Sequence, residues 1–121
     1  MSSRGRAWAR QALRKLLPTP PGEKLSSDLE LVASELITNG VVHGGGVTKV
    51  CLQLDGLRVR LTVCDRVCDE PTVVPGRFGT GHEHGRGMAI VEAVAAGWGV
   101  RQNLPGDPAG KMVWLDLAIR R

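Results

Sequence analysis

Three polar residues at four-residue spacing, Glu35, Asn39 and His43, have side chains suited to metal-assisted phosphate chemistry. On a helix, each step of four residues advances about 40° around the axis, so the three side chains would form one slanting stripe. A side-chain amide oxygen and phosphate oxygens can complete the shell of a hydrated Mg²⁺ ion, which makes Asn39 a candidate magnesium ligand. The same residues also allow a structural interpretation, in which Asn39 and Gly40 end the helix with Asn39 in the left-handed conformation.

A run of glycines, Gly79, Gly81, Gly85 and Gly87, precedes an apolar helical pattern. Glycines before a helix let the backbone approach a phosphate, while the free N–H groups and the helix dipole attract its charge. The run lacks the Gly-Lys-Ser/Thr of a Walker loop, and Ile90 stands where a dinucleotide fingerprint has its third glycine. Taken alone, the run is as compatible with a flexible loop as with a phosphate site.

Asp65 is a third candidate, because it ends an apolar strand pattern beside a long segment rich in proline and glycine. A carboxylate in this position can accept a hydrogen bond from an exocyclic amine. Aspartate is also an ordinary loop residue, so this interpretation depends on the other candidates.

A zinc site is an alternative for the same region, since Cys64, Cys68, His82 and His84 supply four potential ligands. Structural zinc sites usually have more closely spaced cysteine pairs, and Cys64 also fits an ordinary strand position. The odd total of three cysteines argues against a disulfide framework.

Together the motifs resemble the GHKL ATP-binding fold: a helix with Glu-x3-Asn-x3-His, an aspartate ending a strand, and Gly-Arg-Gly opening a later helix. More narrowly, residues 34–45 (SELITNGVVHGG) resemble the N-box of anti-sigma-factor serine kinases of the RsbW and SpoIIAB type. Small actinobacterial ATP-binding regulators are similar. Residues 97–100 (GWGV) and 110–114 (GKMVW) fit the same pattern, and the resemblance covers about residues 25–118.

The resemblance implies a role for each motif. Asn39 would coordinate the Mg²⁺ ion that bridges the ATP phosphates, Glu35 would be the general base, and Asp65 would bind the adenine amine. The residues implied to lie along the phosphates are Gly85, Arg86 and Gly87. Residues 82–84 would belong to a mobile lid. The other residues implied to bind the nucleotide are His43, Gly81, His82 and Met88.

The implied reaction is phosphoryl transfer from ATP to a serine of a STAS-domain anti-anti-sigma protein, while a separate surface would hold a sigma factor. Catalysis of this kind consists mainly of positioning and charge neutralisation. A non-catalytic interaction module on the same fold is the alternative function. Homodimers are common among the relatives, and the apolar face of residues 5–17 could form one or pack on the rest of the chain.

The sequence departs from the family pattern at two positions expected to shape the adenine site. Val67 stands where relatives usually have glycine two residues beyond the adenine-binding aspartate. Met112 stands where relatives often have a threonine that supports this site.

Hydrophobic periodicity predicts the elements that must position these residues. Helices are expected over residues 5–17, 25–42 and 87–96, and strands over residues 47–54, 57–64, 98–104 and 111–119. Ser27-x-x-Glu30 is a capping-box pattern for the second helix, and Asp55-Gly56 predicts a hairpin. This order predicts a two-layer α/β (α+β) sandwich with a mixed, mainly antiparallel sheet of about four strands, covered on one face by three helices. The resemblance implies the Bergerat-type ATP-binding version of that fold.

Composition limits the function classes. A chain of 121 residues predicts one domain over residues 1–121, with a basic segment at 1–24 and a core at 25–121. Six basic residues and one acidic residue give residues 1–24 a charge of +5, and the remainder carries −1. Basic residues confined to one end, with one Phe and no Tyr, do not favour direct nucleic-acid binding. The longest apolar run, residues 93–100, is shorter than a membrane span, so a cytoplasmic protein is expected.

Overall fold

The computed structural model describes residues 2–42, 45–66, 83–104 and 107–119. Within these residues the elements follow in the order α1 (Ser2–Leu16), α2 (Glu23–Val42), β1 (Val47–Asp55), β2 (Arg58–Asp65), α3 (Glu83–Val94), β3 (Gly97–Leu104) and β4 (Asp107–Ala118). The order of helices and strands expected from the periodicity is therefore confirmed.

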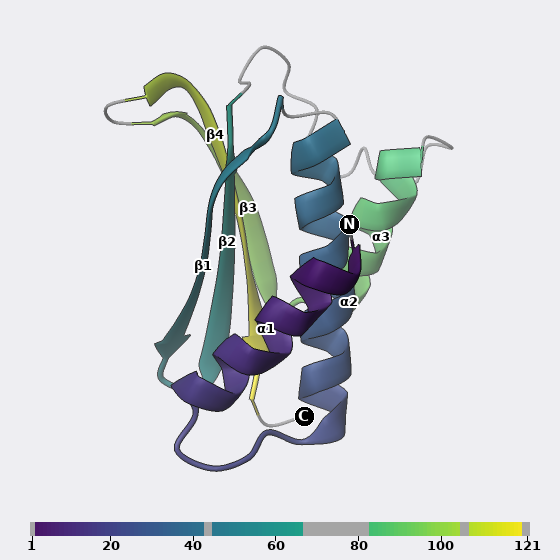
Figure 1. Ribbon diagram of the computed structural model, residues 1–121, viewed down its shortest axis with the longest axis vertical. Coiled ribbons are helices and arrows are strands. Elements are labelled where there is room, and N and C mark those ends of the chain that lie inside the picture. Colours follow the sequence, from purple (N-terminus) through teal and green to yellow (C-terminus); the bar gives the residue numbers. More distant parts are fainter. Residues whose placement is uncertain (1, 43–44, 67–82, 105–106, 120–121) are drawn as a thin grey trace.

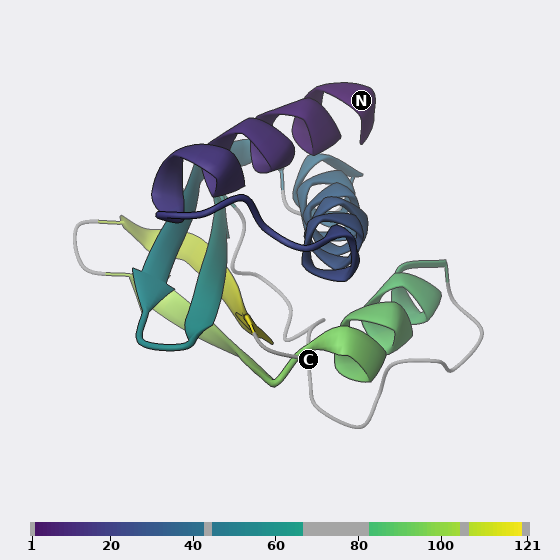
Figure 2. The same cartoon turned by 90° about the horizontal axis from the view of Figure 1, so that it is seen from below.

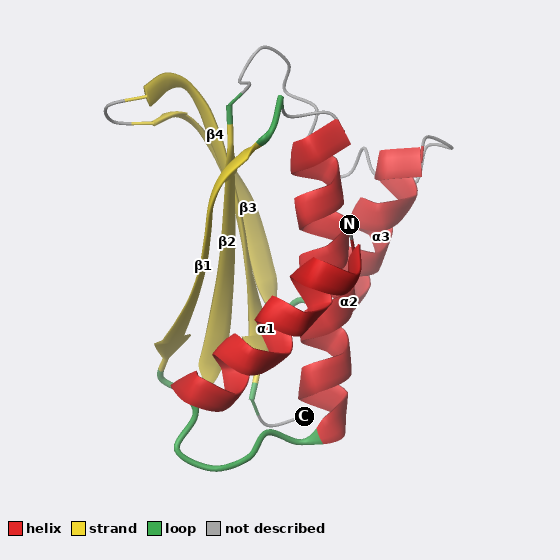
Figure 3. Cartoon of the chain, viewed as in Figure 1, coloured by secondary structure: helices red, strands yellow, loops and turns green. Residues whose placement is uncertain are grey.

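The four strands form an open sheet in the order β1-β2-β4-β3, and the helices lie together on one face of it (Figures 1 and 3). Every pairing among these strands is antiparallel, whereas a mixed, mainly antiparallel sheet was expected. The reason is the place of β4. The crossover through α3 leaves β2 and β3 pointing the same way, and β4 returns between them. The predicted α+β sandwich is confirmed with this change.

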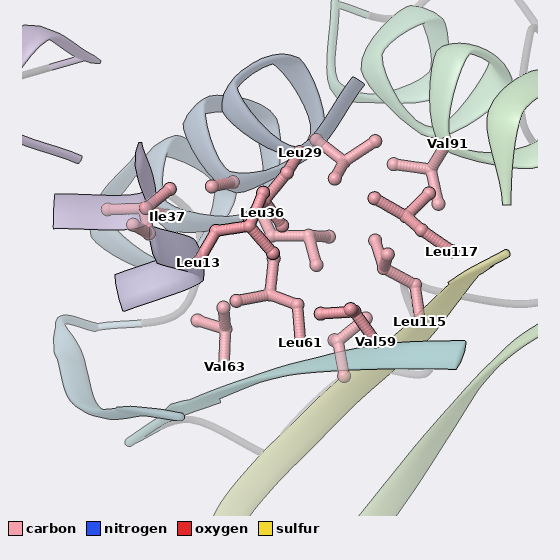
Figure 4. Packing of buried hydrophobic residues seen from close by; sticks show 14 of the residues in the cluster. Leu13, Leu29, Leu36, Ile37, Val59, Leu61, Val63, Val91, Leu115 and Leu117 are labelled. Carbon is pink, nitrogen blue, oxygen red and sulfur yellow. The ribbon is translucent and has the colours of Figure 1, made fainter. Parts of the chain in front are cut away.

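The hydrophobic core lies between the sheet and the helices (Figure 4). Alternate residues of the two central strands point inward, as the twofold strand period requires. These strand residues are Val59, Leu61, Val63, Val113, Leu115 and Leu117. The buried helix residues opposite them are Ala9, Leu13, Leu25, Leu29, Val32, Ala33, Leu36, Ile37 and Val91. Full burial of one such side chain stabilises the fold by about 1.5–3 kcal/mol.

Helix α1 is part of this core, crossing over α2 as seen from below in Figure 2. Ala9 and Leu13 on its inner face are completely buried. On the polar side, Nε of Arg10 donates a hydrogen bond to Oε2 of Glu30 in α2, at 2.6 Å. The apolar face of the basic N-terminal helix therefore packs on the body of the same chain.

No helix in the described residues is long and apolar enough to cross a membrane.

Helix α2 begins four residues before its expected capping box. Gly22 supplies the first carbonyl, which accepts a hydrogen bond from N of Ser26 at 3.1 Å. Ser27 lies inside the helix and its hydroxyl donates to Glu23 at 2.9 Å. The capping-box prediction was wrong because the Pro20-Pro21-Gly22 segment already provides a start, with acidic Glu23 favoured by the dipole in the first turn.

The β1–β2 hairpin is confirmed, with its turn one residue later than expected. Asp55 pairs with Arg58, so the loop consists of Gly56 and Leu57. Gly56 has a φ of 61°, which suits glycine in the first position of a two-residue loop. The N–H of Ile119 donates to the carbonyl of Leu57 at 2.8 Å and ties the end of the chain to this turn.

The other face of the sheet carries an ordered polar and aromatic cluster formed by Arg60, Trp114 and Asp116. Arg60 donates two hydrogen bonds to Asp116, at 2.7 and 3.0 Å, and its guanidinium lies 4.2 Å from the centre of the Trp114 ring. The hydrogen bonds from Arg60 hold the pKa of Asp116 below its ordinary 3.8, against the opposing effect of burial. The indole lies across Gly99, where a Cβ would be 2.8 Å from the ring.

Candidate functional site

The last turns of α2 meet the ends of β1 and β2 at one end of the sheet, and this contact depends on a glycine. A Cβ on Gly40 would lie 2.6 Å from Cγ2 of Val47 and 3.7 Å from Cβ of Asp65. Val47 pairs with Asp65, whereas Lys49 pairs with Cys64, so Thr48 is the extra residue of a β-bulge. The bulge turns Val47 toward α2. Because Gly40 has no side chain, the turn of α2 that contains Asn39 and Gly40 lies against the strand ends that carry Val47 and Asp65.

The connection between α2 and β1 holds this end together through its backbone. The N–H of Gly46 donates to the carbonyl of Gly40 at 3.0 Å, and the N–H of Arg66 donates to the carbonyl of Gly46 at 3.2 Å. Gly45 and Gly46 have φ values of 71° and 115°, which favour glycine. Through these two bonds Gly46 links Gly40, near the end of α2, to the residue after Asp65.

Glu35 and Asn39 lie one turn apart on α2, and both are half-buried. The helix continues through Gly40 to Val42, so the interpretation in which Asn39 and Gly40 end it was wrong. Asn39 is a helical residue near the strand ends, and its side chain carries an amide oxygen, a type of atom that binds hard cations. His43, the third residue of the expected stripe, lies outside the described residues.

Asp65 is buried and forms an ion pair with buried Lys111 of β4, with Oδ2 and Nζ 3.5 Å apart. The two residues are partners across the β2–β4 ladder. The next inward-facing pairs along this ladder are all apolar: Val63 with Val113, Leu61 with Leu115, and Val59 with Leu117. The inward face of β2 and β4 is therefore apolar along most of its length and becomes charged at the end nearest to the Asn39 turn of α2.

Lys111 was not predicted as a site residue; Met112 was singled out instead. In the structure Met112 pairs with Cys64, on the face of the sheet opposite to Asp65, so its side chain does not lie beside Asp65 as expected. Strand alternation explains this, because inward-facing Val113 and Leu115 require residue 111 to face inward as well. The alternation of inward-facing and outward-facing residues along β4 could therefore have identified Lys111 from the sequence. Val67, the other departure, lies outside the described residues.

The glycines expected along the phosphates lie inside a helix. Gly85, Arg86 and Gly87 lie within α3, which begins at Glu83, instead of in a loop before it. The expectation that this triplet precedes the helix was wrong. Met88 also lies in α3, whereas Gly81 and His82 are outside the described residues.

The zinc alternative is only partly within the described residues. Cys64 lies in β2, half-buried on the face away from the helices, while Cys68 and His82 are outside the described residues. No group of three or more His, Cys, Asp or Glu able to hold a metal ion occurs in the described part of the chain.

An apolar pocket of about 280 Å³ lies at the opposite end of the molecule. Its walls are the α1–α2 connection, the β1–β2 turn and the end of the chain. The lining residues are Leu17, Pro18, Thr19, Pro20, Pro21, Gly22, Leu25, Leu54, Gly56, Leu57 and Ile119. None of these side chains is ionisable, so this pocket offers no acid–base group and no charged metal ligand.

No protein-family model matches the chain. An uncharacterized protein from Streptomyces coelicolor is 35% identical over 86 residues, and the match covers 64% of this chain and 82% of that protein. The chain belongs to the same family as this Streptomyces protein.

Proposed function

We propose that the protein is an ATP-binding regulator of the anti-sigma-factor type, acting as a serine/threonine kinase on a STAS-domain anti-anti-sigma protein and sequestering a sigma factor. The observation that carries the proposal is the approach of α2 to β2 at Gly40, which brings Asn39 to the level of buried Asp65. These are the residues to which the resemblance gives magnesium and adenine contacts. The proposed role implies a cytoplasmic protein.

The side chains of Asn39 and Asp65 suit the Mg²⁺ ion and the adenine base that they are proposed to bind. Asn39 offers an amide oxygen, which suits a Mg²⁺ ion that keeps part of its water shell. Asp65 offers an acceptor for the amine of adenine, and Gly40 keeps the helix free of a side chain between the two. Bound Mg²⁺ would neutralise charge on the phosphates, and the rest of the catalysis would be positioning.

In the proposed reaction, the serine oxygen of the STAS partner attacks the γ-phosphorus while the bond to the β–γ bridging oxygen breaks. Glu35 accepts the hydroxyl proton, and ADP leaves. Glu35 is suited to this role because it is half-buried, one helical turn from Asn39, and has no ion pair with another described residue.

Phosphate transfer tests the kinase proposal. The protein is incubated with Mg²⁺, γ-labelled ATP and purified serine-containing STAS-domain proteins, beside Glu35→Gln and the control Glu92→Gln on the exposed side of α3. Loss of a general base lowers rates by about 10²–10⁴-fold, so Glu35→Gln should lose label transfer while Glu92→Gln retains it. Equal transfer by Glu35→Gln and the wild type would exclude Glu35 as the base.

A non-catalytic interaction module on the same fold is the second candidate, and one observation favours it. Asp65 already has a cationic partner in Lys111, so its charge is offset without a bound nucleotide. For such a module, a STAS or sigma partner should form a complex with wild type and Glu35→Gln equally, with no phosphate incorporated.

A further inference from the structure

The ion pair between Asp65 and Lys111 occupies an inward-facing position of the β2–β4 ladder, where the other inward-facing pairs are apolar. Both side chains are almost fully buried, with 5% of Asp65 and 7% of Lys111 exposed. Removing two charges from water costs several kcal/mol per ion, and an apolar pair of similar size often stabilises a fold as well or better. The three preceding inward pairs are apolar, so packing alone gives no reason for the charges at this position.

The two side chains have complementary hydrogen-bonding capacity. An ionised carboxylate only accepts hydrogen bonds, whereas an ammonium group only donates them, and it carries three N–H donors. The contact between Nζ of Lys111 and one oxygen of Asp65 uses at most one of these donors. Together the pair presents an acceptor next to a donor at the edge of the core.

The Watson–Crick edge of adenine has the matching pattern. Its exocyclic N6 amine donates, and the adjacent ring nitrogen N1 accepts. An aspartate alone reads only the amine, but an aspartate with a neighbouring ammonium can read both atoms. Hypoxanthine, which has a carbonyl at position 6 and an N–H at position 1, presents the reverse order.

We propose that Lys111 is a specificity-determining residue that donates a hydrogen bond to N1 of adenine while Asp65 accepts one from the N6 amine. This inference rests on the proposed ATP-binding function and adds to it the residue that selects the base. In the absence of nucleotide, Lys111 offsets the buried charge of Asp65. On binding, the ammonium keeps its contact with Asp65 and directs another N–H to the base.

The test removes each partner of the proposed hydrogen bond separately and together. Mg-ATP and Mg-1-deaza-ATP, in which a C–H replaces N1, are titrated into the wild type and Lys111→Met by calorimetry. The matched control is Lys49→Met, an exposed lysine of β1 on the other face of the sheet. The wild-type comparison of the two nucleotides needs no variant, so it remains informative if Lys111→Met does not fold.

The proposal predicts that wild type and Lys49→Met bind ATP about 10-fold or more tightly than 1-deaza-ATP, as expected for a hydrogen bond from a charged donor. Lys111→Met should bind both nucleotides with equal, weakened affinity. Equal binding of the two nucleotides by the wild type overturns the proposal, as does a preference for ATP that survives in Lys111→Met. Tighter ATP binding by Lys111→Met overturns it too, since Lys111 would then compete for Asp65.

Failure of the proposed function gives a different result. If the wild type binds neither nucleotide, ATP binding itself is refuted and the role of Lys111 with it. Binding of both nucleotides with no difference between them refutes only the role of Lys111. Inosine triphosphate gives a further arm, because the wild type should bind it more weakly than ATP and Lys111→Met should discriminate less between the two.

Discussion

Gly40 of α2 and Val47 of β1 approach so closely that a Cβ on the glycine would lie 2.6 Å from Cγ2 of the valine. Real side chains essentially never come this near, so the helix can reach the strand ends only with glycine at position 40. The β-bulge at Thr48 turns Val47 into this contact. One helix residue and one strand residue therefore set how closely the end of α2 approaches the strand ends at Val47 and Asp65.

Substituting Gly40 by alanine should destabilise the protein in spite of the better helix propensity of alanine. Overpacking costs about 1–3 kcal/mol, whereas alanine gains up to about 1 kcal/mol over glycine in a helix. Valine is stiff at χ1 and cannot easily move its methyl group away. Chemical denaturation of Gly40→Ala should show a net loss of roughly 1–2 kcal/mol.

Two further variants test the cause. Val47→Ala removes the obstructing methyl groups, so the double variant should lose less stability than the sum of the two single variants. Gly22→Ala is the matched control, because nothing lies within 4 Å of a Cβ there. Additive losses in the double variant would show that Gly40 and Val47 do not meet.

The indole of Trp114 lies on Gly99 and can be displaced by one methyl group. A Cβ at Gly99 would be 2.8 Å from Cζ2 and Nε1 of the indole, so Gly99→Ala should cost about 1–3 kcal/mol and alter the near-ultraviolet circular dichroism. Gly97→Ala is the control, since its Cβ would lie 3.9 Å from the same ring. Equal spectra and unfolding midpoints for the two variants would contradict this packing.

The hydrogen bonds between Arg60 and Asp116 predict a pH-dependent contribution to stability. Hydrogen bonds from Arg60 lower the pKa of Asp116 in the folded state, below its ordinary 3.8. The folded form therefore binds the proton less readily than the unfolded form. The stabilisation is complete above about pH 4 and is lost as the pH falls through the lowered folded pKa.

Denaturation of Asp116→Asn at several pH values measures this contribution. At pH 7 the variant should be less stable by about 1.5–3 kcal/mol, as expected for hydrogen bonds between charged groups. The difference from the wild type should shrink as the pH falls below about 4. Asp55→Asn, at an exposed end of β1, should stay within about 0.5 kcal/mol of the wild type. A pH-independent difference would show that the charge of Asp116 is not what matters.

The buried side chains on the inner face of α1 should stabilise the protein as other core side chains do. Leu13 is completely buried, so Leu13→Ala should destabilise the protein by about 2–5 kcal/mol in thermal or chemical unfolding. Leu16 packs only partly against the core, and Leu16→Ala should cost clearly less. Similar, small losses for both would mean that α1 is not docked on α2 in solution.

Much of the fold could be predicted from local patterns. The glycine after Asp55 specifies the hairpin, and the alternation of Val59, Leu61 and Val63 specifies its inward face. Helix starts were less accurate, because several residues near each end of a helix can serve as its cap. The antiparallel character of the whole sheet depends on β4 returning between β2 and β3, which no local pattern records.

The candidate site was predictable in its residue types but not in its contacts. Asn39 and Asp65 were both recognised as polar groups at the ends of apolar elements. The importance of Gly40 depends on the approach of Val47, which is set by a bulge and by tertiary packing. Lys111 could have been found from strand parity, but its partner Asp65 is 46 positions earlier and is identified only by the β2–β4 register.

The central claim is that Asn39 binds a magnesium–nucleotide complex beside Asp65, and equilibrium titration with Mg-ATP tests it most directly. We predict that the wild type binds Mg-ATP with a dissociation constant of roughly 1–100 μM, a range common for enzyme substrates. Asn39→Ala should weaken binding by at least about 10-fold, equivalent to 1.4 kcal/mol, while Gln53→Ala, an exposed amide on β1, should bind like the wild type. No binding by the wild type at about 1 mM Mg-ATP, or equal affinity for wild type and Asn39→Ala, would contradict the claim.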